Sequence, residues 1–117
     1  MNNKGKLAEL KALMMLQDKG YSLVDVNFNC RFGEIDIIVE NKKYIVFVEV
    51  KARESDSYVK PREYVDEYKQ QKMAASANLY LATHPTKLQP RFDVVEVVCS
   101  DYKIKSIKHL ENAFQLV

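Results

Sequence analysis

The chain has 117 residues, of which 47% are hydrophobic and 29% are charged, with only three Gly and three Pro. This length suits a single domain over residues 1–117, and the composition excludes a disordered, collagen-like or low-complexity protein. The 18 basic and 16 acidic residues give a net charge of +2, so total charge argues neither for nor against a nucleic-acid partner.

The N-terminal part of the chain predicts a helix followed by a strand. Residues 6–19 are rich in Ala, Leu, Met, Lys and Glu and contain neither Gly nor Pro. Gly20 stands where a helix C-cap belongs. Residues 22–27 then alternate apolar and polar side chains, as in a strand with one buried face. We expect a helix over 6–19 and a strand over 22–27.

Two further strands follow, joined by a tight hairpin. Residues 33–40 (GEIDIIVE) and 44–51 (YIVFVEVK) flank the polar loop Asn41-Lys42-Lys43, a pattern typical of two antiparallel strands. With the strand over 22–27 they form the predicted nucleus of the sheet.

The C-terminal part predicts a second long helix and two more strands. Helix formers fill residues 62–82, and Pro61 stands at a first-turn position. Residues 92–98 and 104–107 have the apolar content of strands, and residues 110–114 predict a short helix. Helices and strands in this order indicate an α/β or α+β protein.

No segment predicts a membrane span or a secretion signal. The apolar run around Tyr44 to Val48 is far shorter than the ~20 residues that cross a bilayer, and Met1 to Lys6 lack a signal-peptide core. We expect a cytoplasmic protein in which Cys30 and Cys99 are reduced thiols.

An acidic residue interrupts the apolar side of the first predicted helix. At ~100° per residue, Glu9 falls on the same stripe as Ala12, Leu13 and Leu16. A carboxylate on a core-facing stripe either extends to water at the edge of that stripe or serves a site.

A second acidic residue interrupts a predicted strand. Alternation places Ile35, Ile37 and Val39 on one face, and Asp36 with Glu34 and Ile38 on the other. Asp is disfavoured in strands, so Asp36 either lies on an open face or belongs to a site.

The strand predicted over 44–51 ends in two charged residues. Glu49 and Lys51 follow the apolar run and project to one side. If the hairpin loop consists of Lys42 and Lys43 alone, Asp36 lies opposite Glu49, whereas a three-residue loop shifts the pairing by one.

Two opposed carboxylates repel each other, so something must offset the repulsion. A shared proton, the neighbouring Lys51 or a divalent metal ion can do so. A carboxylate pair with open positions suits Mg²⁺ or Mn²⁺.

The most specific motifs are Gly33-Glu-Ile-Asp-Ile-Ile38 and Phe47-Val-Glu-Val-Lys51. At these residues the chain resembles the PD-(D/E)xK nuclease superfamily, with Ile35 in place of the Pro, and it closely resembles the YraN-like group of endonuclease-type proteins. The likeness runs nearly end to end. It also includes Gly5, Glu9, Ala12, Leu16, Gly20-Tyr21, Asn27, Arg53, Pro61, Val65, Lys69, Lys72, Arg91 to Val95 and His109 to Phe114.

The resemblance implies both a fold and a site. The fold is the three-layer, restriction-endonuclease-like α/β fold, a mixed sheet flanked by helices. Carried over residue by residue, the resemblance makes Asp36 and Glu49 metal-binding carboxylates and Lys51 the catalytic lysine. It makes Glu9 the additional helix-borne acid of the resolvase-like branch.

These residue types suit phosphodiester hydrolysis, which needs an activated water and neutralisation of charge at phosphorus. We expect Asp36 and Glu49 to hold one or two Mg²⁺ or Mn²⁺ ions, with the Val50 carbonyl as a further ligand. Glu9 completes the metal shell directly or through water, and Lys51 orients or helps to deprotonate the attacking water.

Basic residues predict a nucleic-acid interface. Arg62, Lys69 and Lys72 share one stripe of the helix predicted over 62–82, and we expect them, with Arg53, to contact phosphates. The alternative is a solvated basic face. Because the net charge is only +2, we expect weak binding by a monomer, with a homodimer or a protein partner supplying the remaining contacts.

Three other polar residues predict no site. His84 and His109 lack partners at metal-ligand spacing, so we expect both on the surface, His109 at the start of the short helix. Asp93 is expected to support the end of the sheet or to pair with Arg91.

We therefore expect a Mg²⁺-dependent endodeoxyribonuclease, structure-selective if it follows the resolvase-like branch. Two alternatives stay open: a non-catalytic nucleic-acid-binding domain of the same fold, and a nuclease acting on RNA. The intact set of Asp36, Glu49 and Lys51 argues against the first, and the sequence does not separate DNA from RNA.

Overall fold

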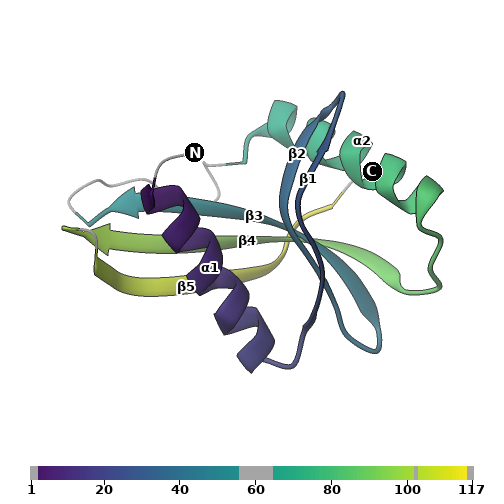
Figure 1. Cartoon of the computed structure of the whole chain (residues 1–117). Helices are drawn as coiled ribbons and strands as arrows, with labels where there is room; N and C mark the ends of the chain where they lie inside the picture. The colour runs from purple at the N-terminus through teal and green to yellow at the C-terminus, as the bar shows by residue number, and fades with distance from the viewer. Residues whose placement is uncertain (1–2, 56–64, 102, 116–117) are drawn as a thin grey trace.

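The protein has an α/β fold in which a five-stranded sheet lies between two helices (Figure 1). It is described by a computed structural model over residues 3–55, 65–101 and 103–115. In chain order the elements are α1 (Asn3–Asp18), β1 (Ser22–Cys30), β2 (Gly33–Glu40), β3 (Tyr44–Glu54), α2 (Glu67–Thr83), β4 (Gln89–Ser100) and β5 (Lys103–Phe114).

The sheet is mixed, as predicted. Its strand order is β1-β2-β3-β4-β5. All neighbours are antiparallel except β3 and β4, which pair in parallel from Tyr44 with Gln89 to Glu54 with Cys99. Parallel neighbours need a crossover, and α2 lies in the chain between them.

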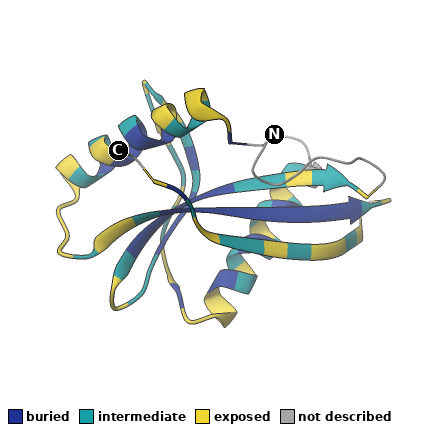
Figure 2. Cartoon of the chain, turned by 180° about the vertical axis from the view of Figure 1, so that it is seen from behind, coloured by how far each residue is buried: buried dark blue, intermediate teal, exposed yellow. Residues whose placement is uncertain are grey.

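The helices cover opposite faces of the sheet. Ala8, Ala12 and Leu16 of α1 pack in a cluster with alternate residues of β2, β3 and β4, whereas Met73 and Tyr80 of α2 pack in the other cluster. Because strand side chains alternate between faces, the central strands contribute to both clusters. Figure 2 shows the consequence in β4, which is buried along most of its length.

The β1–β2 hairpin bends away from the rest of the sheet (Figure 1). Asn27 in β1 has φ 51°, a left-handed conformation that interrupts regular strand geometry. Alternation places Ile35 with Ile37 and Val39, but Ile35 packs instead in the α2-side cluster with Ile38. The prediction for Ile35 is therefore wrong, because regular alternation does not continue through the bent part of the hairpin.

The second helix is shorter than predicted. It begins at Glu67, because Asp66 is its N-cap and accepts the Lys69 N–H at 2.8 Å. Val65 and Asp66 precede the helix, and the predicted start at Arg62 falls outside the described residues.

The short helix predicted over 110–114 is wrong. β5 continues to Phe114, with Leu110 opposite Val94 and Phe114 opposite Phe92. Pairing with β4 outweighs the local helix propensity of this segment.

Two simpler expectations concern membranes and thiols. Within the described residues, neither helix combines the length and apolarity needed to cross a bilayer. Cys30 and Cys99 are both free, as predicted.

Candidate active site

The β2–β3 hairpin brings together the two carboxylates singled out in the sequence. Its loop consists of Lys42 and Lys43: the Asn41 N–H donates to the Tyr44 carbonyl at 3.0 Å, and Asn41 Oδ1 accepts the Tyr44 N–H at 2.7 Å. Pairing runs from Glu40 with Ile45 to Ile37 with Val48. One further step of this register sets Asp36 beside Glu49, which is the shorter of the two predicted loop arrangements.

Asp36 is partly buried and anchored by the neighbouring strand. Its Oδ2 accepts the Val50 N–H at 2.8 Å. The pKa of Asp36 is raised to about 7, chiefly by burial and then by the charge of Glu49, with smaller increases from Glu9 and Glu34 and an opposing effect of the Val50 hydrogen bond. Near neutral pH this carboxyl therefore exchanges a proton.

Glu49 is buried, with 4% of its surface exposed. Two lysines approach the same oxygen, since Lys51 Nζ lies 3.2 Å and Lys69 Nζ 3.5 Å from Glu49 Oε1. The second oxygen, Oε2, is buried and has no hydrogen-bond partner among the described residues. A buried carboxylate oxygen without a donor is costly, and such an atom needs an explanation.

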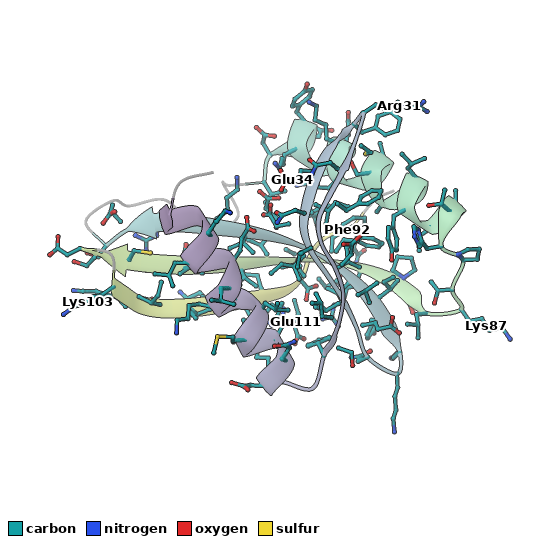
Figure 3. The ribbon with its side chains drawn as sticks, in the orientation of Figure 1. Arg31, Glu34, Lys87, Phe92, Lys103 and Glu111 are labelled. Atoms are coloured by element: carbon teal, nitrogen blue, oxygen red, sulfur yellow. The ribbon has the colours of Figure 1, made fainter. Side chains whose placement is uncertain are left out.

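Glu9 lies on the side of α1 that faces the carboxylates. Burial raises the pKa of Glu9, the charges of Glu34 and Glu49 raise it further, and a hydrogen bond from Asn27 lowers it. The amide orientation that satisfies Asn27 donates to Glu34 Oε1 at 2.7 Å and to Glu9 Oε1 at 3.2 Å. Asn27 therefore links Glu9 of α1 to Glu34 of β2, and Figure 3 shows Glu34 on the hairpin near α1 and α2.

The four carboxylates Glu9, Glu34, Asp36 and Glu49 thus form an acidic cluster. Only Glu49 is fully buried, and two lysines neutralise it on one side. Residues 8–97 match the profile described as "Uncharacterised protein family UPF0102". The chain belongs to the UPF0102 family. The matched range contains Glu9, Asp36, Glu49 and Lys51, and the assignment agrees with the YraN-like membership expected from the motifs.

Relatives that align with this chain over nearly their whole length confirm this membership. A UPF0102 protein of Caldanaerobacter subterraneus subsp. tengcongensis is 43% identical over 113 residues, covering 94% of this chain and 93% of that protein. One from Clostridium acetobutylicum is 41% identical over 119 residues, with 99% and 98% covered. One from Persephonella marina is 41% identical over 114 residues, with 97% and 94% covered.

The basic residues predicted to bind phosphate have different partners in this UPF0102 protein. Lys69 reaches into the acidic cluster, whereas Lys72 Nζ lies 4.9 Å from the ring centroid of Tyr68. Arg53 Nε lies 3.4 Å from Glu96 Oε2 at the β3–β4 pair. Arg62 lies outside the described residues, so its predicted contact with phosphate stays a prediction.

The donors present in this UPF0102 protein suit a hard divalent cation. Among the described residues, no three His, Cys, Asp or Glu side chains lie close enough together to hold a metal ion. Asp36 and Glu49 nevertheless offer oxygen ligands of the kind that Mg²⁺ and Mn²⁺ prefer. Glu49 Oε2, buried and unpartnered, is the atom that such a cation would satisfy.

A second polar cluster joins β4 and β5 and differs in kind. Asp93, fully buried, accepts from Arg91 at 2.9 and 2.8 Å, and its Oδ2 lies 2.7 Å from His109 Nε2. The Asn112 N–H also donates to it at 2.9 Å. Burial alone would raise the pKa of Asp93, but the bonds from His109 and Arg91 lower it. This carboxylate is fully partnered, which indicates a structural role.

Two predictions are decided by this second cluster. The predicted pair of Asp93 with Arg91 is confirmed. The surface position predicted for His109 is wrong, because its side chain is 2% exposed and it lies within β5. His84 is exposed, as predicted.

The sequence did not reveal the roles of three residues in and around the acidic cluster. Glu34 was predicted to share a face with Asp36 but was not assigned to the site, and its charge contributes to the raised pKa of Asp36. Asn27 gave no local signal for its contacts, because its link to Glu9 depends on the bend in β1. Lys69 was placed on a phosphate-binding stripe, and only the packing of α2 reveals its approach to Glu49.

Proposed function

We propose that this UPF0102 protein is a metal-dependent nuclease of the PD-(D/E)xK type with a restriction-endonuclease-like fold, hydrolysing DNA phosphodiester bonds with structure selectivity. The mixed sheet between two helices and the acidic hairpin followed by Lys51 support the proposal. The observation that carries it is the buried, unpartnered Oε2 of Glu49 beside the partly buried Asp36.

The alternative explanation for the buried Glu49 beside the partly buried Asp36 is a structural role, and the second cluster shows the features of a structural carboxylate. Asp93 accepts hydrogen bonds from Arg91, His109 and Asn112 and has a lowered pKa. Asp36 instead has a raised pKa and accepts a hydrogen bond from the Val50 N–H. A site kept in that costly state suits a ligand that supplies positive charge.

In this mechanism Asp36, Glu49 and the Val50 carbonyl would hold Mg²⁺ or Mn²⁺, and Glu9 would complete the set of acidic ligands. A bound divalent cation supplies positive charge that stabilises the phosphoryl oxygens and the leaving oxygen. Both lysines contact Oε1 of Glu49, which keeps Oε2 available as a ligand.

Lys51 orients the attacking water at the edge of the cluster. The water oxygen forms a bond to phosphorus, one ester bond from phosphorus to oxygen breaks, and the proton lost by the water is balanced by one gained by the leaving oxygen. The Lys51 ammonium offsets the negative charge that develops at phosphorus. Asp36 would bind the cation in its ionised form, so metal affinity should increase as pH rises through about 7, where the metal-free carboxyl ionises.

The test is cleavage of labelled nucleic acids by the purified protein. Duplex, single-stranded, flap and four-way-junction DNA, together with an RNA duplex, are incubated with Mg²⁺, with Mn²⁺ and with EDTA. We expect metal-dependent cleavage of DNA that Asp36→Asn, Glu49→Gln and Lys51→Ala each reduce by a factor of a hundred or more. The three effects should not add, because the residues act on one transition state.

A matched control uses another carboxylate of the same hairpin. Glu40→Gln changes charge by the same amount at the loop end of β2, away from the cluster, and should leave cleavage unchanged. Cleavage that persists in EDTA would contradict the metal requirement, and cleavage of RNA alone would change the substrate class. No cleavage under any condition, with binding retained, would favour the non-catalytic alternative.

A further inference from the structure

Two cations lie against aromatic rings at the tip of the β1–β2 hairpin and on the first turns of α2. Tyr68 is 67% exposed, and Lys72 Nζ lies 4.9 Å from its ring centroid. In the hairpin turn, Arg31 Cζ lies 4.9 Å from the ring centroid of Phe32. Figure 3 shows Arg31 at the hairpin tip beside α2.

Both pairs line the same depression. A hollow of about 250 Å³, which we name the aromatic hollow, separates the hairpin turn from α2. Its lining residues are Arg31, Phe32, Tyr68, Gln71, Lys72 and Ala75. All of them belong to the described residues, and they come from two segments that are distant in the chain.

Packing against the sheet and its core does not account for the exposed position of the Tyr68 ring. Tyrosine rings bury large areas in cores and interfaces, but two thirds of this side chain faces solvent. A polar residue would serve equally well at an exposed helix position, and it would not leave a large ring in water. The stacking of Lys72 supports the ring without covering it.

The two segments that line the aromatic hollow also carry residues of the acidic cluster or its lysine partner. Tyr68 precedes Lys69, whose Nζ is 3.5 Å from Glu49. Phe32 precedes Gly33, where β2 begins and leads to Glu34 and Asp36. A strand of nucleic acid lying in the hollow would therefore contact the two segments that also carry Asp36 and Lys69.

We propose that the aromatic hollow binds the unpaired nucleotides of a nucleic-acid strand, with bases stacked on Tyr68 and Phe32 and phosphates neutralised by Arg31 and Lys72. The inference rests on the proposed function for where the strand leads. Aromatic rings and cations together are the usual components of single-strand sites, because every base has a face that can stack. In a duplex those faces are already covered, so the rings select strands with unpaired bases.

The test measures binding in EDTA, where hydrolysis does not interfere. The probes are a fluorescein-labelled oligothymidylate of about 20 nucleotides, which exceeds a typical single-strand site, and an abasic oligonucleotide of the same length. Wild-type protein should bind the base-bearing strand more tightly. Tyr68→Ala should weaken that binding about fivefold or more, since stacking on a ring contributes about 1–3 kcal/mol per base. Binding of the abasic strand should change less than twofold.

Three further variants separate stacking from charge. Tyr68→Phe retains the ring and should bind both probes as the wild type does. Lys72→Ala should weaken binding of both probes and reduce the salt dependence by about one phosphate contact. Lys103→Ala removes an exposed lysine at the far end of the sheet (Figure 3) and should change neither.

Some results would overturn the inference without touching the proposed nuclease. Equal affinity of the wild type for both strands would do so, as would Tyr68→Ala binding oligothymidylate like the wild type, or no binding of either strand. Conversely, base-dependent binding without metal-dependent cleavage of any substrate would contradict the proposed function and leave the aromatic hollow in place.

Discussion

Asp36 is the residue at which stability and the proposed chemistry conflict. Its pKa of about 7 lies above the value near 3.9 that an unfolded chain gives an Asp. Between these two values the folded protein holds a proton that the unfolded chain releases. The free energy of unfolding therefore decreases as pH rises from about 4 to about 7, and above that range the cost of the ionised carboxylate is fully present.

The first prediction follows from this decrease in stability with rising pH. Asp36→Asn keeps an acceptor for the Val50 N–H but has no charge, so its stability should match the wild type near pH 4 and exceed it near pH 8. The excess is on the order of a few kcal/mol, since one pKa unit corresponds to about 1.4 kcal/mol. Urea unfolding in EDTA at both pH values measures it. A variant less stable than the wild type at pH 8 would mean that the ionised carboxylate stabilises the fold.

The same substitution at Asp93 should have the opposite sign. Asp93 is fully buried and its pKa is lowered by His109 and Arg91, so its charge contributes stability that is present above the unfolded pKa and lost as pH falls. Asp93→Asn should lower the free energy of unfolding by about 3–5 kcal/mol at neutral pH, because it leaves Arg91 buried without its partner. The same urea series checks this, and an unchanged midpoint would show that the pair contributes nothing.

At the scale of elements, the start of α2 matters most to the site. Asp66 accepts the Lys69 N–H at 2.8 Å and thereby fixes the first turn, which carries both Tyr68 and Lys69. One capping bond therefore supports the lysine of the acidic cluster and one ring of the aromatic hollow. Loss of this capping bond should increase the mobility of both Lys69 and Tyr68.

The prediction for this element uses two variants of Asp66. Asp66→Ala should lower the free energy of unfolding by about 0.5–2 kcal/mol and increase amide exchange in the first turn of α2. Asp66→Asn retains a capping oxygen and should stay close to the wild type. Hydrogen exchange followed residue by residue measures the effect. Unchanged protection at Lys69 in Asp66→Ala would show that packing alone holds the turn.

Across the whole molecule, the parts predictable from sequence are those fixed by local chemistry. The polar loop around Lys42 and Lys43 set the hairpin, and the hairpin set the register of Asp36 with Glu49. Helix formers ending at Gly20 likewise located α1. Short-range rules suffice where turns are tight and the side-chain pattern repeats regularly.

The parts that were not predictable depend on contacts between distant segments. Residues 110–114 have a composition compatible with a helix, yet they pair with β4 as part of β5. His109 gave no sign of burial, because Asp93 is its partner only once β4 and β5 pair. Lys69 joined the acidic cluster for the same reason, through the packing of α2. Tertiary pairing outweighs local preference at each of these positions.

From the parallel pairing of β3 with β4 we expect a particular order of folding events. Strands β1 to β3 are joined by tight turns, so their closure loses little chain entropy, whereas Val48 meets Asp93 only after the chain that includes α2 has folded back. Asp36 and Glu49 thus come together early, on a local hairpin, and Lys51 comes with them. Lys69 can contact Glu49 only after α2 packs on the sheet. We therefore expect this second ion pair of Glu49 to form in the slow, long-range step of folding.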